Sequence, residues 1–186
     1  MPDRIAILGW GSLLWDEQLT FDQQHDVWQF DGPLLKIEFS RISTSRAGAL
    51  TLVLDSRNGT ATQVAYCASR RSALLEAVED LRERESTKNV SNIAYTHRNG
   101  EERSRDGETG AVVSAWAIAQ GFDAVVWTDL QSNFRQKTGR SFSVDAAVAY
   151  LQHLPKDGRR AAFEYINKAP AFVDTPLRRR VVGAHG

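Results

Sequence analysis

A chain of 186 residues can bury one sizeable core, which predicts a single domain over residues 1–186 rather than two ordinary domains. Its composition, 42% hydrophobic and 25% charged, is typical of a soluble globular protein and excludes a disordered chain. The 23 basic and 23 acidic side chains cancel, so the basic excess that nucleic-acid binding normally requires is missing.

The N-terminus and the cysteine content indicate a cytoplasmic protein. The apolar run at residues 5–8 is too short for a signal peptide or a membrane span, so we expect no membrane partner. Cys67 is the only cysteine, which excludes an internal disulfide and fits a reducing compartment. We expect Cys67 to be a small buried hydrophobe rather than a reactive thiol.

Strand signals dominate the first two-thirds of the chain. Short apolar or alternating runs are bounded by turn residues, with mostly short connections. This pattern favours a small mixed or antiparallel barrel-like sheet over a parallel α/β sheet. The predicted strands cover residues 5–8, 34–42, 50–54, 61–68, 90–96, 111–119 and 124–127.

Helices are predicted over residues 71–85, over 145–153 behind the cap Ser143, and over 159–168. Pro170 and Pro176 are expected to stop helical structure and leave an extended tail, in which the basic run at 178–180 is solvated. Residues 120–186 are therefore predicted to be a helical C-terminal extension. The predicted fold class is α+β, with helices flanking the barrel.

A glycine-containing loop follows the first predicted strand. Gly9 and Gly11 permit positive φ and close backbone approach, so N–H groups from Leu8 to Leu13 could converge on an anion. The alternative is that the glycines only make a tight turn. A dinucleotide-binding fingerprint is rejected because Leu14 replaces its third glycine, and a nucleophile elbow because Ser12 lacks the following glycine.

One acid of the helix at residues 71–85 differs from the others. The apolar residues Leu74, Val78 and Leu81 define one helical face, and Glu85 continues it four residues after Leu81. Glu83, like Glu76 and Glu79, points away from this face and is expected to be solvated. The spacing therefore predicts that Glu85 lies on the buried side.

The position of Glu85 is electrostatically poor. Desolvation and the negative end of the helix dipole both disfavour its charged form, which suits a group that takes up and releases a proton. The alternative is a buried ion pair with an arginine, either Arg82 or Arg41. The four histidines, His25, His97, His153 and His185, show no metal-ligand spacing, so we expect no metal and no cofactor.

An ordered set of motifs resembles the γ-glutamylcyclotransferases, especially the glutathione-degrading ChaC branch. Residues 7–15, ILGWGSLLW, resemble its [FY]GYGSL-x-W segment. Residues 50–55, LTLVLD, are similar to its LTLV-x-D strand, and residues 64–66, VAY, to its G-x-AY strand. Residues 81–85, LRERE, resemble its L-x-x-R-E, whose last glutamate is the catalytic acid/base.

The resemblance implies a small β-barrel with flanking helices, and it implies a site. Glu85 would be the general acid/base, and the loop amides would bind the α-carboxylate or γ-glutamyl end of the substrate. The loop residues are Leu8, Gly9, Trp10, Gly11, Ser12 and Leu13. The implied reaction is cyclisation of a small γ-glutamyl-amine compound to 5-oxoproline with release of the amine, without metal, cofactor or protein nucleophile.

The chain departs from these enzymes at several places. Trp10 stands where they have tyrosine, and residues 86–89, STKN, replace the G-G-Y that follows R-E in the glutathione-specific branch. Residues 127–134 have no counterpart in those enzymes. Two alternatives therefore stay open: a non-catalytic module that binds a small anion on the same fold, and a lyase or transferase that acts on another acyl-amine.

Overall fold

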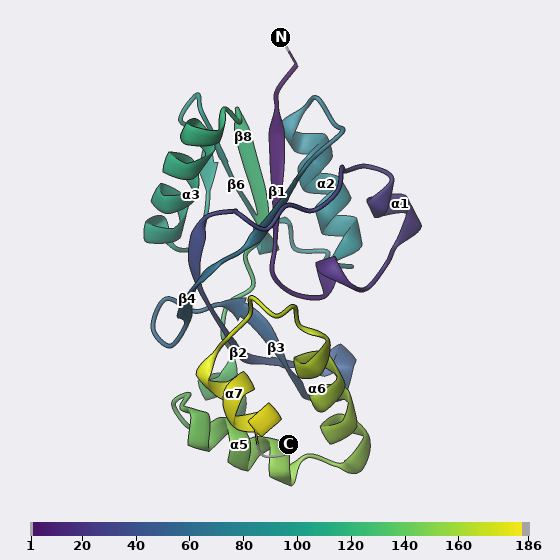
Figure 1. Ribbon diagram of the computed structural model, residues 1–186, viewed down its shortest axis with the longest axis vertical. Coiled ribbons are helices and arrows are strands. Elements are labelled where there is room, and N and C mark those ends of the chain that lie inside the picture. Colours follow the sequence, from purple (N-terminus) through teal and green to yellow (C-terminus); the bar gives the residue numbers. More distant parts are fainter. Residues whose placement is uncertain (1, 184–186) are drawn as a thin grey trace. The chain divides into compact units, whose positions relative to one another are not determined.

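The structure, a computed structural model, describes residues 2–183 and divides the chain into two units. Each unit combines segments that are distant in the sequence (Figure 1). The first comprises Met1–Gly9, Asp16–Leu35 and Gln63–Leu130, and the second comprises Trp10–Trp15, Lys36–Thr62 and Gln131–Gly186. The expectation of one domain stays a prediction.

The first unit contains a mixed five-stranded sheet in the order β5-β1-β8-β6-β7. Its central strands, β1 and β8, are parallel to each other and are almost entirely buried. Their sequences, IAILG and AVVWT, are continuously apolar because helices α2 and α3 cover the two faces of the sheet (Figure 1). The strands are β1 (Ile5–Gly9), β5 (Ala65–Ala68), β6 (Ile93–His97), β7 (Glu102–Arg103) and β8 (Ala124–Thr128).

Two of the sequence predictions for this unit are confirmed and one is wrong. Helix α2 (Leu74–Arg84) lies within the predicted range, and Cys67 is a buried residue of β5 whose desolvation raises the pKa of its thiol. Residues 111–119, predicted as a strand, belong to helix α3 (Gly107–Gln120). Asp106 caps its N-terminus by accepting from Glu108 N, and Gly121 ends it at a φ of 72°. The short helix α1 is Leu19–Asp22.

A second sheet, most of which lies in the second unit, has the order β3-β2-β4. It consists of β2 (Leu34–Ser43), β3 (Ala49–Leu54) and β4 (Thr60–Gln63). The run at residues 61–68, predicted as one strand, is divided between β4 and β5 of different sheets. The pairing of β2 with β3 shifts register between Glu38 and Arg41. Residues 37–40 are all buried, so this part of β2 does not alternate between a buried and an exposed face.

The second unit is completed by α4 (Phe134–Thr138), α5 (Val144–His153), α6 (Lys156–Lys168) and α7 (Pro176–Gly183). Helices α5 and α6 confirm the prediction, and Ser143 caps α5 by accepting from Ala146 N at 3.1 Å. The predicted extended tail is wrong. Pro176 is the first residue of α7, a position where its missing N–H costs nothing. Arg178, expected to be solvated, donates instead to the carbonyls of Ala169, Pro170 and Val173.

The α+β class is confirmed, whereas a barrel is not shown. Within residues 2–183 the strands form two sheets with separate edges and no closed barrel. Over the same residues, each helix is too short or too polar to cross a membrane. His185 lies outside the described residues.

Candidate functional site

The end of α2 presents two ionisable side chains rather than one. The buried residues of this helix are Leu74, Ala77, Val78, Leu81 and Arg84. Glu85 is the C-cap and is half-buried, whereas Glu83 is exposed as predicted. The expectation that Glu85 leaves bulk solvent is thus met in part, and the polar group that the helix buries most deeply is the guanidinium of Arg84, with 6% exposure.

Three backbone hydrogen bonds fix the position of Glu85. Its own N–H donates to Leu81 O at 3.0 Å, Ser86 N–H donates to Glu83 O at 2.9 Å, and Thr87 N–H donates to Arg82 O at 3.2 Å. This is a Schellman closure with Ser86 at the position that glycine usually takes. The φ of Ser86 is 50°, in the left-handed region. The Glu85 backbone is therefore held at the negative end of α2 by a conformation that costs free energy.

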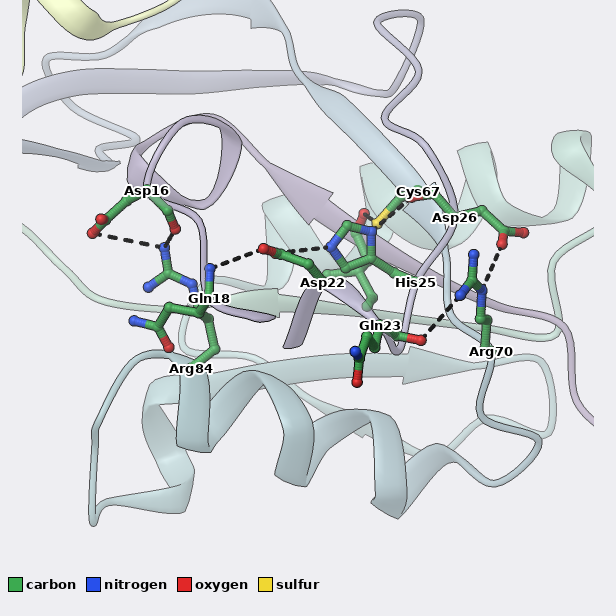
Figure 2. Close-up of polar contacts among 10 residues, drawn as sticks. Asp16, Gln18, Asp22, Gln23, His25, Asp26, Cys67, Arg70 and Arg84 are labelled. Atoms are coloured by element: carbon green, nitrogen blue, oxygen red, sulfur yellow. Dashed lines mark hydrogen bonds and ion pairs between the residues drawn. The ribbon is translucent and has the colours of Figure 1, made fainter. Parts of the chain in front are cut away.

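Arg84 connects the end of α2 to the segment that follows the glycine loop. Its Nη2 donates to the carbonyl oxygen of Asp16 at 2.7 Å and lies 3.9 Å from Asp16 Oδ2 (Figure 2). Asp16 is the residue at which the chain re-enters the first unit after Trp15. The sequence prediction missed this contact. The signal was the spacing of three residues between Leu81 and Arg84, which continues the buried face.

Arg82, one of the two arginines considered as partners for Glu85, is engaged on the exposed side of α2. Its guanidinium binds the carboxylate of Glu79, and its Nη1 donates to Thr87 O at 2.7 Å. This ion pair lowers the pKa of Glu79 and raises that of Arg82. Glu79 is half-exposed, so the pair adds little stability.

His25 is the buried histidine of the first unit, and Figure 2 shows its polar contacts. Its Nδ1 donates to Asp26 O at 2.6 Å, and its Nε2 lies 3.6 Å from Asp22 Oδ1. A nucleophilic pair with Cys67 would require a thiolate, but burial raises the pKa of that thiol. His25 and Cys67 are therefore not a base and a nucleophile, in agreement with the sequence analysis.

The glycine loop continues directly from β1. Leu8 and Gly9 are the last residues of that strand, in the first unit with Glu85, whereas Trp10 to Leu13 belong to the second unit. Residues Ser12–Leu14 form a 3₁₀ turn, closed by Leu14 N–H donating to Gly11 O at 3.0 Å. The first N–H groups of such a turn have no partner within it.

The loop glycines do not use the positive φ that glycine permits. Among the described residues, neither Gly9 nor Gly11 has a positive φ, and the φ of Gly11 is −118°. Gly11 is required for close approach instead, because a Cβ atom there would lie 2.9 Å from Tyr165 Oη. Tyr165 is held from α6 by an edge-on contact with Trp15, with ring centroids 5.2 Å apart. The guanidinium of Arg46 lies 5.2 Å from the centre of the Tyr165 ring.

Glu38 is a buried acid that the sequence analysis did not single out. Several hydrogen-bond donors surround its carboxylate. Its Oε1 accepts from Phe39 N at 2.8 Å, and its carboxylate also accepts from the Thr175 hydroxyl and from Leu177 N. Burial raises the pKa of Glu38, the three hydrogen bonds oppose this rise, and nearby Asp55 adds to it. Thr175 immediately precedes α7 and Leu177 is its second residue, so the Glu38 carboxylate lies at the N-terminus of that helix.

Within residues 2–183, no three side chains of the His, Cys, Asp or Glu types come close enough together to hold a metal ion. The end of α2, in the first unit, offers one carboxylate and one buried guanidinium, and the loop, whose residues 10–13 belong to the second unit, offers backbone amides. Comparisons of the chain with protein-family models, with curated proteins and with solved structures find no match.

Proposed function

We propose that this chain is a γ-glutamylcyclotransferase-like enzyme that converts a γ-glutamyl-amine compound to 5-oxoproline and a free amine. The substrate's own α-amine attacks its γ-carbonyl carbon, a C–N bond closes the five-membered ring, and the C–N bond to the leaving amine breaks. Glu85 takes the proton from the attacking amine and gives it to the leaving amine. Most of the rate enhancement comes from holding the substrate in its ring-closing conformation.

The observation that carries the proposal is the geometry at the end of α2. Glu85 is half-buried and is fixed by the closure through Ser86. A carboxylate at the negative end of a helix has a weakened preference for its charged form, which a proton-transfer group needs. Strained backbone next to a polar group is typical of functional sites, because strain persists only where the surroundings enforce it.

The loop has the second role in this proposal, the binding of the substrate's α-carboxylate. Its contribution is the N–H groups of Gly9 to Leu13 at the end of β1 and the start of the 3₁₀ turn. Arg46, whose guanidinium lies 5.2 Å from the centre of the Tyr165 ring, is a cation of the same unit as Gly11. A γ-glutamylcyclotransferase-like fold and a cytoplasmic, reducing setting for Cys67 belong to the same proposal.

A non-catalytic module that binds a small anion is the second candidate. The observation in its favour is the segment that follows Glu85, where residues 86–89 depart from the glutathione-specific enzymes. Ser86 there adopts a conformation that glycine usually provides. This module would use the loop amides and would need no proton transfer from Glu85.

Incubation with a panel of γ-glutamyl dipeptides, glutathione and γ-glutamylamines, with 5-oxoproline as the readout, tests the proposal. We expect turnover of at least one γ-glutamylamine or dipeptide, and little or none of glutathione. Binding of these compounds, measured by calorimetry, without any 5-oxoproline would instead support the binding module. Absence of both binding and turnover across the panel would overturn both candidates.

A further inference from the structure

A cavity of about 370 Å³ lies among the last three helices of the second unit. Its size is within the range of small-molecule sites, about 300–1,000 Å³. It is separate in sequence from Glu85 and from the glycine loop, so nothing inferred from it depends on the proposed function. Its lining residues are Val148, Leu151 and Gln152 from α5, Arg159 and Phe163 from α6, and Arg180 and Val181 from α7.

The apolar part of the lining comes from one face of each helix. Val148 and Leu151 are three residues apart on α5, so they lie on the same side of that helix. Phe163 and Val181 complete the apolar surface from α6 and α7. Burial of a hydrocarbon chain or an aromatic ring against these side chains would be favourable, because it removes apolar surface from water and desolvates few polar groups.

Two guanidinium groups add positive charge to this lining. Nη2 of Arg159 donates to the carbonyls of Gln152 at 2.9 Å and Leu154 at 3.2 Å, and these neutral partners leave its charge uncancelled. Arg180 lies 3.9 Å from a carboxylate oxygen of Asp145, and their side chains are 62% and 88% exposed. Such an exposed pair is weak. Among the residues that the structure describes, the lining contains no acidic side chain.

We propose that this cavity is a binding site for a small amphipathic carboxylate, with its apolar tail against Phe163 and its carboxylate at Arg159 and Arg180. The planar guanidinium of arginine binds a carboxylate through two parallel hydrogen bonds. The apolar surface supplies the affinity and the two cations select the charge. A neutral molecule of the same shape would bind more weakly.

Titration of the full chain with decanoate, below its micelle-forming concentration, tests this site by calorimetry, with decanol as the uncharged analogue. We expect saturable binding of one decanoate per chain and weaker binding of decanol. Arg159→Gln and Arg180→Gln should each weaken decanoate binding about tenfold, the loss typical of a hydrogen bond to a charged group. Arg160→Gln is the matched control, because Arg160 neighbours Arg159 on α6 but is 77% exposed and paired with Asp157.

Arg159 also binds carbonyls at the end of α5, so weaker binding in Arg159→Gln alone does not distinguish a lost ligand contact from a folding defect. A second variant, Gln152→Glu, makes this distinction. It places an acid on the exposed rim without removing a contact, so it should weaken decanoate binding and leave decanol binding unchanged. Glu85→Gln should leave decanoate binding unaltered, which separates this site from the proposed activity. Equal binding of decanol and decanoate, unaltered binding in Arg180→Gln, or no decanoate binding would each overturn the proposal.

Discussion

Glu38 and Glu85 are two glutamates that lie at opposite ends of two different helices, Glu38 at the start of α7 and Glu85 at the end of α2. Glu38 meets the N-terminus of α7, where the Thr175 hydroxyl and Leu177 N–H donate to its carboxylate, and Phe39 N–H of its own strand donates as well. Glu85 is the C-cap of α2, where the helix presents carbonyl groups and the negative end of its dipole. Glu38 is almost completely buried, with 1% exposure, whereas Glu85 is half-buried.

Burial alone therefore does not separate a structural acid from a candidate catalytic one. The more buried glutamate is the one whose hydrogen-bonding groups the fold satisfies, and its role is to hold α7 against β2 within the second unit. The less buried glutamate sits where the backbone is strained and the field is unfavourable. We therefore expect substitutions to separate them, with Glu38 affecting folding and Glu85 affecting catalysis.

The largest expected effect is that of Glu85→Gln on activity. The amide keeps the shape of the side chain but removes the proton-transfer group, so formation of 5-oxoproline should fall by roughly 10²–10⁴-fold. The melting temperature should stay close to that of the wild type, because the backbone closure of α2 does not use the carboxylate. Steady-state assays of 5-oxoproline together with thermal unfolding measure both quantities.

Glu83→Gln is the control for that variant. Glu83 lies two residues earlier on the exposed side of α2, so both activity and melting temperature should be nearly unchanged. If Glu85→Gln melts far below the wild type while retaining full activity per folded molecule, Glu85 is structural and the comparison with Glu38 fails.

The second effect is the loss of stability in Glu38→Ala. Truncation leaves three buried donors without their acceptor, each costing about 1–3 kcal/mol, so we expect a total loss of about 3 kcal/mol or more. Urea unfolding followed by circular dichroism measures it. Activity per folded molecule should be retained, and a specific loss of activity in a stably folded variant would instead give Glu38 a place in the chemistry.

These two glutamates also show how far the sequence could predict the site. The spacing along α2 points to the end of the helix, but the positions three and four residues after Leu81 both continue its buried face. Arg84 occupies the more buried of these two positions, and Glu85 is the C-cap. Glu38 could not be predicted, because the groups that cover it come from the start of α7, far along the chain, and the alternation in β2 does not reveal them.

The fold was predictable where the sequence pattern matched one structure only. The continuous apolar strands β1 and β8 and the capped helix α5 were of this kind. The run in α3 contains no charge over residues 109–119, so neither the helical nor the strand period shows in it. At α7, Pro176 was interpreted as a stop, although proline is equally common as the first residue of a helix.

Gly11→Ala tests whether the loop needs glycine at this position because of the close approach of Tyr165. The added methyl would lie 2.9 Å from the buried Tyr165 hydroxyl, so we expect a loss of about 1–3 kcal/mol in stability and weaker substrate binding. Tyr165→Phe removes that hydroxyl and should restore both in the double variant. Unfolding and calorimetric titration of all three variants measure this, and an additive double variant would show that the close approach is not the reason for glycine.

The pH dependence of stability gives a smaller and more specific test of Glu38. Burial raises its pKa above the ordinary value of 4.5, so the folded protein keeps this proton at pH values where the unfolded chain has released it. The stability that this group contributes is therefore fully present below pH 4.5 and is lost as the pH rises through the pKa of the folded state. Urea unfolding at a series of pH values measures this decline, and Glu38→Gln should lack it. Parallel pH profiles of the two proteins would contradict the assignment.

The smallest expected effect is a gain of about 1 kcal/mol in Ser86→Gly, which probes the strain beside Glu85. Ser86 has a φ of 50°, a conformation that disfavours a side chain by about 1 kcal/mol or more and that glycine adopts freely. The melting temperature should rise by a few degrees, roughly 2–4 °C for a chain of this size.

Ala47→Gly is the matched control for Ser86→Gly, because Ala47 has a φ of 53° and lies in the other unit. Both variants should gain similar stability if the left-handed backbone is the whole cost at each position. If the closure of α2 only needs that backbone, Ser86→Gly should keep full activity, since glycine preserves the hydrogen bonds that fix Glu85. A stabilised Ser86→Gly variant with reduced activity would show that the serine side chain contributes to the site. If Ala47→Gly alone is stabilised, contacts of the Ser86 side chain offset its backbone strain, and strain no longer distinguishes Glu85 from Glu38.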